Sequence, residues 1–222
     1  MAEKQILTGS DIIVKVLAEQ GVETIFGYSG GAILPTYDAV FQYNEIHENN
    51  PMPLIVPANE QGAGFMASGY ARATGKPGIV LVTSGPGATN TVTPVRDAMA
   101  DSIPMIVICG QVNRSSIGSD AFQEAPITSV MGSVAKHVFL VTKEEKLAAT
   151  LRAAFEISTS GRPGPVVVDV PKDVQTASIE FDANSKLNIN AYRERVKVIE
   201  NNRLSDQQCE SFYNYLRASN RP

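Results

Sequence analysis

Glu60 is the carboxylate whose surroundings in the sequence most strongly indicate chemistry. It follows the apolar run Leu54–Val56 and opens a predicted helix that ends near Thr74 and has three glycines between 61 and 70. Each glycine inside a helix costs about 1 kcal/mol relative to alanine, so something is expected to pack closely against this one. A solvated carboxylate that favours the helix dipole is the alternative. The glycine-lined helix favours a buried, functional acid.

Three segments rich in glycine and small residues each follow a predicted strand and precede a helix. They are Gly27–Leu34, Pro57–Gly64 and Thr83–Asn90. Such loops expose backbone N–H groups at the carboxyl ends of parallel strands, where open α/β sheets bind ligands. Each loop alone is equally explained as a tight turn, but three at one edge favour a site. No G-x-G-x-x-G or P-loop motif is present, so a phosphate tail is not the expected ligand here.

A second candidate for chemistry is the segment Ser119–Ala125. Its Phe122 and Gln123 could close over a small substrate, or Phe122 could belong to the core with Gln123 in solvent. The spacing leaves both interpretations open. His47 and His137 have no partner spacing for a metal or a catalytic triad. No metal ligands are therefore predicted.

These segments are positioned by alternating strands and helices. Strands are predicted at Val22–Phe26, Leu54–Val56, Ile79–Thr83, Met105–Cys109, His137–Val141 and Pro165–Val170. The helices begin near Thr8 or Ser10, Ile33, Glu60, Thr89 and Glu144. Because the strands are nearly continuous apolar runs, the pattern predicts a doubly wound, mostly parallel six-stranded α/β sheet with helices on both faces.

The domain pattern ends after Pro171. Residues 1–175 are predicted to form the domain and residues 176–222 a linker and helix that lead to an absent central domain. Within that segment, 176–203 is polar, and Leu204–Ala218 is a helix for which Ser205 is the expected cap.

The composition is that of an ordinary soluble chain of 222 residues. A net charge of −4 gives no basic footprint for nucleic acid. No apolar run approaches the roughly 20 residues that span a bilayer. Two cysteines without metal or disulfide spacing, and an N-terminus without targeting character, favour the reducing cytoplasm. Cys109, inside an apolar run, is expected to be a small buried hydrophobe.

Several motifs together resemble a known family, the catalytic subunit of acetolactate (acetohydroxyacid) synthase, and in particular its N-terminal domain, which binds the pyrimidine of thiamine diphosphate. The resemblance covers roughly residues 6–180. The motifs are Phe26–Pro35, Asn59–Arg72, Val82–Asn90, Gly110–Val112, Asp120–Ala125, Ser160–Pro165 and Asp169–Val174. The first three are common among thiamine-diphosphate decarboxylases and carboligases. The Phe-Gln-Glu-Ala and Pro-Lys-Asp-Val segments point more narrowly to acetolactate synthase.

The resemblance implies roles for individual residues. Glu60 would hydrogen-bond N1′ of the aminopyrimidine and favour the imino tautomer that takes the proton from thiazolium C2. The pyrimidine pocket would be lined by Tyr28, Ser29, Gly30, Gly31, Thr83, Pro86 and Asn90. Gly31 would also lie beside the reacting centre and Gln123 near cofactor and substrate. Phe122 and Lys172 would stand at the substrate entrance, and Arg162 would contact FAD, which has a structural role in this family.

The sequence departs from the family's pattern in three places. Many relatives have Pro where Ser29 stands and His where Asn59 stands, and the loop from Phe41 to Pro53 is several residues longer than usual. The family's Gly-Asp-Gly segment, which holds Mg²⁺ and the diphosphate on a later domain, does not occur. FAD is held mainly by an absent middle domain. The family's active site lies between two subunits, so this chain would supply half of one.

Three hypotheses for function follow. The leading one is the N-terminal part of acetolactate synthase, which joins two pyruvates into 2-acetolactate, or pyruvate and 2-ketobutyrate, in branched-chain amino acid synthesis. It implies a homodimer or higher oligomer, a possible regulatory subunit, and no binding to nucleic acid or membrane. The fragment alone is expected to be inactive. The second is another carboligase or 2-oxo acid decarboxylase of the same fold, and the third is a non-catalytic assembly module.

Overall fold

The computed structural model describes residues 5–201 and 204–221. The chain divides into two compact units after Leu187. The first unit therefore extends past residue 175, where the sequence pattern of the domain ends. The physical reason is a strand pair, described below, that joins the two ends of this unit.

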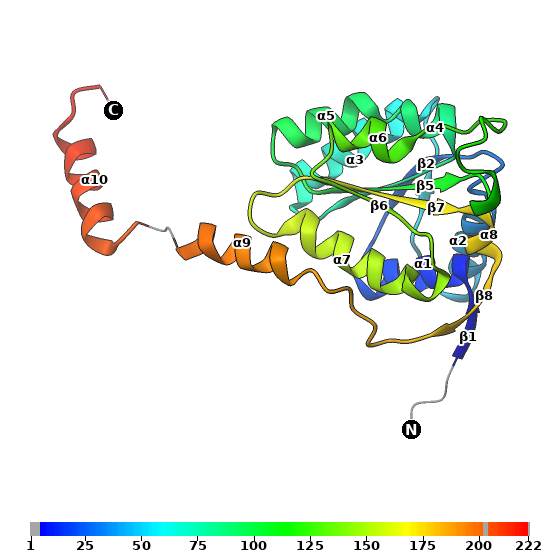
Figure 1. Ribbon diagram of the computed structural model, residues 1–222. Helices are drawn as coiled ribbons and strands as arrows, with labels where there is room; N and C mark the ends of the chain where they lie inside the picture. The colour runs from blue at the N-terminus through cyan, green and yellow to red at the C-terminus, as the bar shows by residue number, and fades with distance from the viewer. Residues whose placement is uncertain (1–4, 202–203, 222) are drawn as a thin grey trace. The chain divides into compact units, whose positions relative to one another are not determined.

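A six-stranded sheet in which every neighbouring pair is parallel forms the centre of the first unit (Figure 1). From one edge to the other the strands are β3 (Leu54–Ile55), β2 (Ile25–Tyr28), β4 (Gly78–Val82), β5 (Met105–Gln111), β7 (Pro165–Pro171) and β6 (His137–Leu140). All residues of β4, β5 and β7 are buried, as expected of strands covered on both faces. The predicted doubly wound α/β fold is confirmed.

Helices lie on both faces of the sheet (Figure 1). One face carries α1 (Gly9–Glu19), α2 (Leu34–Ile46), α7 (Leu147–Thr159) and α8 (Lys172–Thr176). The other carries α3 (Glu60–Thr74), α4 (Gly85–Thr89), α5 (Val92–Ala100) and α6 (Ile127–Gly132). Two short 3₁₀ turns, η1 (Arg114–Ser116) and η2 (Glu144–Lys146), complete the connections. Cys109 is fully buried in the core between β5 and the second group of helices, as expected.

Side-chain caps fix where the helices begin and end. Thr8 forms a reciprocal capping box with Asp11 at the start of α1, so Thr8 rather than Ser10 is the cap. The Asn59 side chain accepts the Gly62 N–H at 2.8 Å and starts α3 at Glu60. Gly75, at φ +74°, ends that helix in the left-handed conformation that favours glycine.

The region expected to be a linker contains regular structure. β8 (Ser178–Phe181) pairs antiparallel with β1 (Gln5–Thr8), a contact between residues at least 170 positions apart. This pair forms its own two-stranded sheet, and its short, mostly exposed strands carry no strong sequence pattern. The second unit contains α9 (Asn190–Asn201), also within the expected linker, and α10 (Asp206–Ala218). Ser205 caps α10 as predicted.

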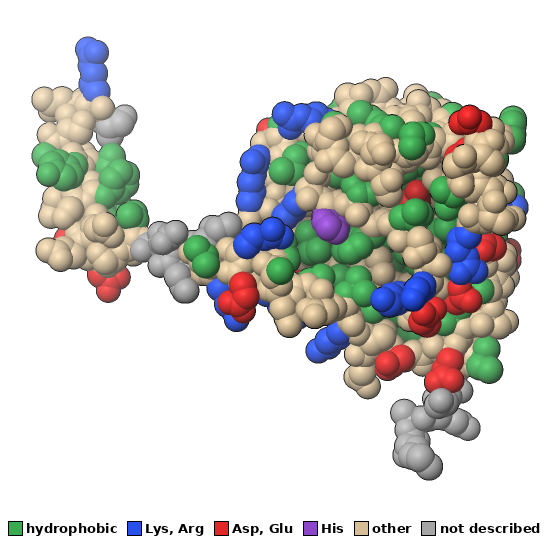
Figure 2. Space-filling view, in the orientation of Figure 1, with side chains coloured by type: hydrophobic (Ala, Val, Ile, Leu, Met, Phe, Trp, Pro, Cys, Tyr) green, Lys and Arg blue, Asp and Glu red, His purple; other side chains and the backbone are tan. Residues whose placement is uncertain are grey.

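No helix among the described residues is both long and apolar enough to cross a membrane. On the face of the sheet-bearing unit in Figure 2, basic side chains lie mainly towards the left and acidic ones mainly towards the right, where some basic side chains stand among them.

Candidate functional site

The strand order places a topological switch point between β2 and β4. The chain leaves β2 for α2 on one face of the sheet and leaves β4 for α4 and α5 on the other. The loops after the two strands therefore diverge towards opposite faces, at the position where open α/β sheets bind ligands, and this junction is here called the Glu60 crevice. All three glycine-rich segments predicted from the sequence meet there.

Thr83 joins the first and third of these segments. Its Oγ1 accepts a hydrogen bond from the Ala32 N–H at 3.2 Å. A Cβ built on Gly30 would stand 2.5 Å from Thr83 Cγ2, and one on Gly87 would stand 2.6 Å from the same atom. Both contacts are closer than real side chains allow, so the small residues here are needed for the loops to come together.

Glu60 joins the second and third segments. Its side chain is only 9% exposed although it begins a helix. Oε2 accepts a hydrogen bond from Asn90 Nδ2 at 2.9 Å, and Oε1 lies 3.4 Å from where a Cβ on Gly87 would stand. No other group in residues 5–201 or 204–221 donates to Oε1. The carboxylate is thus fixed by one oxygen and free to accept or share a proton with the other.

The helical glycines have a more ordinary explanation than a ligand. A Cβ on Gly64 would stand 2.4 Å from Pro94 Cγ, so this glycine allows α3 to pack against α5. Gly69 has no neighbouring atom within 4 Å. The prediction of a buried Glu60 is confirmed, but close packing of helices rather than of a ligand explains Gly64.

The other residues predicted for the pyrimidine pocket lie around this crevice and are open to solvent. Tyr28 is 38% exposed at the end of β2, and Ser29, Gly31 and Pro86 are also exposed. Asn90, which holds Glu60, is exposed on its outer side. The geometry is that of one wall of a binding site.

The loop of residues 118–125, here called the Gln123 loop, lies beside the crevice. The backbone oxygen of Gln123 is 2.2 Å from where a Cβ on Gly85 would stand, so the loop rests directly on the start of α4. Phe122 is 87% exposed, and Gln123 is also exposed. Of the two interpretations left open by the sequence, a core role for Phe122 is therefore wrong.

Hydrogen bonds make the Gln123 loop an ordered turn. The N–H groups of Gly118 and Ala121 donate to the Glu124 carboxylate and hold the pKa of Glu124 below its ordinary value. Asp120 (φ +53°) and Gln123 (φ +59°) adopt the left-handed conformation, which is uncommon for residues other than glycine. Strained backbone conformations of this kind persist where the surrounding structure holds them, and they are frequent at ligand-binding sites.

Lys172 lies at the start of α8 and is exposed, beside an ion-pair cluster. Arg114 Nε donates to Asp173 at 2.6 Å, and its Nη1 pairs with Glu144 at 2.5 Å. Arg114 also bonds the Thr142 carbonyl oxygen at 3.1 Å. These bonds tie the segment that bears Lys172 to η1, where the chain enters the region of the Gln123 loop.

Arg162 is the one predicted site residue that the fold places elsewhere. It precedes β7 and therefore lies at the amino ends of the strands, at the opposite edge of the sheet from Glu60. Its guanidinium donates to Ser102 Oγ and the carbonyl oxygen of Met99, both at 2.8 Å. It lines a hollow of about 520 Å³ together with Arg96 and Ser133.

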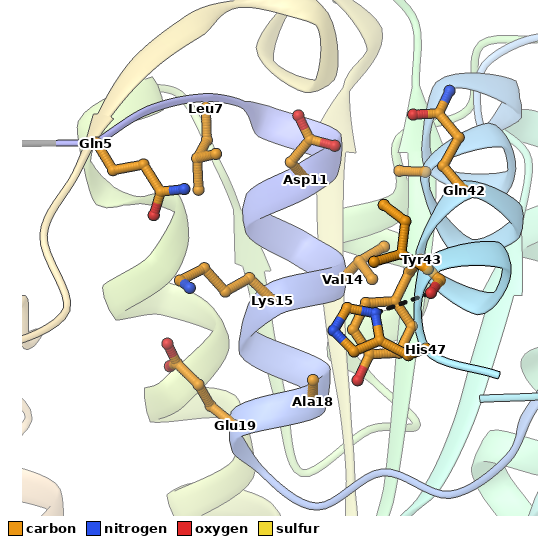
Figure 3. Close-up of a pocket in the computed structure, with 12 residues that line it drawn as sticks. Gln5, Leu7, Asp11, Val14, Lys15, Ala18, Glu19, Gln42, Tyr43 and His47 are labelled. Carbon is orange, nitrogen blue, oxygen red and sulfur yellow. Dashed lines mark hydrogen bonds between the residues drawn. The ribbon is translucent and has the colours of Figure 1, made fainter. Parts of the chain in front are cut away.

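A pocket of about 460 Å³ between α1 and α2 contains none of the predicted site residues (Figure 3). Lys15 and Glu19 come from one wall, and the ring of His47, stacked on Tyr43 at 4.0 Å, from the other. These helices cover the face opposite α3, so the pocket is separate from the Glu60 crevice. His47 Nδ1 bonds the Tyr43 carbonyl oxygen, which gives it a local structural role.

Sequence reasoning missed a buried polar pair, Asp169 and Gln111. Asp169 is 1% exposed in β7, and burial raises its pKa to about 7, although a hydrogen bond from Gln111 opposes the shift. The signal was an acidic residue inside an otherwise apolar strand, which is rare without a partner. In the described part of the chain, no three His, Cys, Asp or Glu side chains gather as a metal site.

A doubly wound domain with a buried carboxylate among glycine-rich loops at its switch point has the arrangement of a ligand-binding α/β domain. The chain belongs to the thiamine pyrophosphate enzymes, since residues 7–133 match the family described as the N-terminal TPP binding domain of these enzymes.

Curated relatives narrow the comparison. The chain is 56% identical over 171 residues to the mitochondrial acetolactate synthase catalytic subunit of Saccharomyces cerevisiae, covering 77% of this chain and 24% of that protein. It is 45% identical over 193 residues to an acetolactate synthase of Mycobacterium bovis, covering 87% of this chain and 30% of that one. The chloroplastic enzyme of Arabidopsis thaliana is 50% identical over 167 residues, or 75% and 24% of the two chains. The chain thus spans less than a third of the length of these relatives.

Proposed function

We propose that this chain supplies the aminopyrimidine-binding half of an acetolactate synthase active site, in an enzyme that joins two pyruvates into 2-acetolactate and CO₂. The observation that carries the proposal is Glu60, buried at the switch point with one carboxylate oxygen fixed by Asn90. The identity of 44–56% to acetolactate synthases supports this reaction over others of the same fold.

Glu60 holds the central role in this proposal. Its Oε1 would share a proton with N1′ of the aminopyrimidine and so favour the imino tautomer, while Asn90 keeps Oε2 in place. Bound thiamine diphosphate supplies the carbon acid that becomes the nucleophile towards pyruvate. The low exposure of Glu60 keeps water from competing for its free oxygen.

The positions of the remaining site residues support their proposed roles. Tyr28, Ser29, Gly30, Gly31, Thr83 and Pro86 would line the side of the site against which the pyrimidine binds. Gln123 and Phe122, exposed on the neighbouring loop, would contact cofactor and substrate, and the exposed Lys172 would stand at the substrate entrance. Arg162, at the far edge of the sheet, would contact FAD rather than the pyrimidine.

The solvent exposure of Tyr28, Ser29, Gly31 and Pro86 supports a site that is completed by another polypeptide surface. A homodimer or higher oligomer would bring a diphosphate- and Mg²⁺-binding domain against it, and FAD would be held mostly outside this chain. The acceptor is pyruvate or 2-ketobutyrate. A regulatory subunit and a cytoplasmic location remain predictions.

A domain exchange tests the proposal. Residues 5–187 of this chain, the first compact unit, replace the corresponding part of the Saccharomyces cerevisiae enzyme. The chimera is expected to make 2-acetolactate from pyruvate, detected as acetoin after acidification. The matched Glu60→Gln chimera should lose at least 100-fold in kcat, the range for a proton-transfer group.

Two results would contradict the proposal. The first is a folded, dimeric chimera that binds thiamine diphosphate and Mg²⁺ yet makes no acetolactate. The second is a Glu60→Gln chimera as active as its parent. Circular dichroism and light scattering of both proteins separate these outcomes from a failure to fold or assemble.

A further inference from the structure

Asp169 and Gln111 form a buried pair on one face of the sheet. In the parallel register of β5 and β7, Asp169 stands opposite Cys109, two residues before Gln111, so the two polar side chains share a face. Gln111 Nε2 donates to Asp169 Oδ2 at 2.9 Å. Gln111 is 2% exposed and Asp169 is 1% exposed, so neither side chain is paired with bulk water.

The pair determines which way the Gln111 amide faces. Oε1 of Gln111 accepts from the Val112 N–H at 2.9 Å, and the second Nε2 hydrogen goes to the Ala125 carbonyl oxygen at 3.3 Å. A flipped amide would place its oxygen against the Asp169 carboxylate and its NH₂ against an N–H group. The Asp169 carboxylate therefore favours the amide orientation in which Gln111 Nε2 donates to the Ala125 carbonyl oxygen.

Ala125 is the last residue of the Gln123 loop. Its carbonyl oxygen also accepts from the Ile127 N–H at 2.8 Å, at the start of α6. Gln123, two residues earlier, rests on Gly85 through its backbone oxygen. The loop is thus fixed on its α4 side by Gly85 and at its end by Gln111.

A gain in the stability of the fold does not explain why Asp169 is buried. Its Oδ1 has no hydrogen-bond partner, and the cost of burying a carboxylate raises the pKa of Asp169 to about 7. A buried polar group without a partner lowers the free energy of unfolding. Asp169 weakens the fold and yet orients the Gln111 amide. Its best explanation is therefore that it positions Gln111.

We propose that Asp169 and Gln111 are positioning residues that hold the Gln123 loop, and with it the Gln123 side chain, beside the Glu60 crevice. Asp169 acts only through Gln111 and touches neither cofactor nor substrate. The inference rests on the proposed function for what Gln123 contacts, but the loop-holding contact itself can be tested without cofactor.

The test compares two substitutions in the intact 222-residue chain at pH 8. Asp169→Asn keeps an oxygen that accepts from Gln111, whereas Asp169→Leu, of similar size, removes it. Hydrogen exchange of the Gly118 and Ala121 amides, which are bonded to Glu124 within the loop, is followed for each. Asp169→Leu should accelerate their exchange at least ten-fold, and Asp169→Asn should keep it within two-fold of the parent.

Urea unfolding of the same proteins excludes a general loss of structure. A merely structural role predicts that loop exchange follows global stability, whereas positioning predicts fast loop exchange in an Asp169→Leu chain that is as stable as its parent. If that variant does not fold, Gln111→Met, which removes the donor itself, should release the loop equally. Unchanged loop exchange in the folded variant, or equal acceleration by Asn and Leu, would overturn the inference.

The acetolactate-forming chimera provides the readout that concerns function. There, Asp169→Leu should raise the thiamine diphosphate concentration for half-maximal activity at least five-fold, and Asp169→Asn should restore it. If the parent chimera is inactive, the proposed function fails while the exchange result still decides the positioning pair. If the loop is released but cofactor affinity does not change, the link between the pair and the cofactor is wrong.

Discussion

Two buried acids in this fold are placed in opposite ways. Glu60 begins a helix at the switch point, with one oxygen fixed by Asn90 and the other beside Gly87. Asp169 lies in the middle of a strand, sealed from solvent, with one oxygen held by Gln111 and the other without a partner. The same chemical group therefore stands at the strand ends, where open α/β sheets bind ligands, in one place, and inside the sheet against a neighbouring amide in the other.

The difference shows how burial should be interpreted in such a domain. The more deeply buried acid, with its raised pKa, is the one that faces no ligand. Glu60, which is also buried at 9% exposure, is the acid that stands at the switch point, where open α/β sheets bind ligands. Position at the strand ends, and not depth of burial, therefore supports the proposal that Glu60 is the functional carboxylate.

The largest stability effect is expected at Asp169. Its pKa rises from 3.8 to about 7 on folding, so between these values the folded protein holds more protons than the unfolded chain. The free energy of unfolding should therefore fall as pH rises through this window, by about 4 kcal/mol in total. Asp169→Asn, which resembles the protonated acid, should be more stable than the parent by about this amount at pH 8 and equal to it near pH 4.

Urea unfolding across this pH range measures the effect, with Glu60→Gln as the matched control. Because that substitution keeps an oxygen for Asn90, it should leave the slope between pH 4 and 7 in place. The comparison of the two acids would be wrong if Asp169→Asn destabilised the fold at pH 8. It would also be wrong if Glu60→Gln removed the slope as completely.

The next largest effect is expected at Gly85, where the start of α4 touches the Gln123 loop. An alanine there must adopt φ +38° with its Cβ 2.2 Å from the Gln123 carbonyl oxygen. Strain and displacement of the loop should lower the free energy of unfolding by about 3 kcal/mol. Gly69→Ala in α3 is the control, since its Cβ meets nothing within 4 Å, and it should add about 1 kcal/mol. Equal stability of the two variants would refute this contact.

The smallest effect concerns the cap that begins α3 and so places Glu60. Asn59→Ala removes the bond to the Gly62 N–H and should lower the free energy of unfolding by about 1 kcal/mol. Asn59→Ser, which retains a capping oxygen, should recover most of the loss. Thermal unfolding of both variants measures it, and a loss shared equally by serine would show that Asn59 acts in some other way.

Much of the fold could be predicted because its signals are local. The strands are continuous apolar runs, and Asn59 before Glu60 marks the start of a helix. The pairing of β1 with β8 joins the two ends of the first unit, and no local pattern indicates it. Its prediction would need the three-dimensional path of the chain.

The candidate site divides in the same way. Glu60 and the three glycine-rich segments could be placed at one edge because the carboxyl ends of parallel strands must meet there. The pairing of Asp169 with Gln111 depends on the register between β5 and β7, which the sequence does not specify. Arg162 precedes its strand, so its position at the opposite edge could have been inferred from order alone.

Exchange of the thiamine diphosphate C2 proton for deuterium, followed by NMR in the chimeric enzyme, tests the role of Glu60 most directly. Glu60→Gln should slow the exchange at least 100-fold while the cofactor remains bound. Exchange at the parental rate in a folded, cofactor-loaded Glu60→Gln protein would contradict the account.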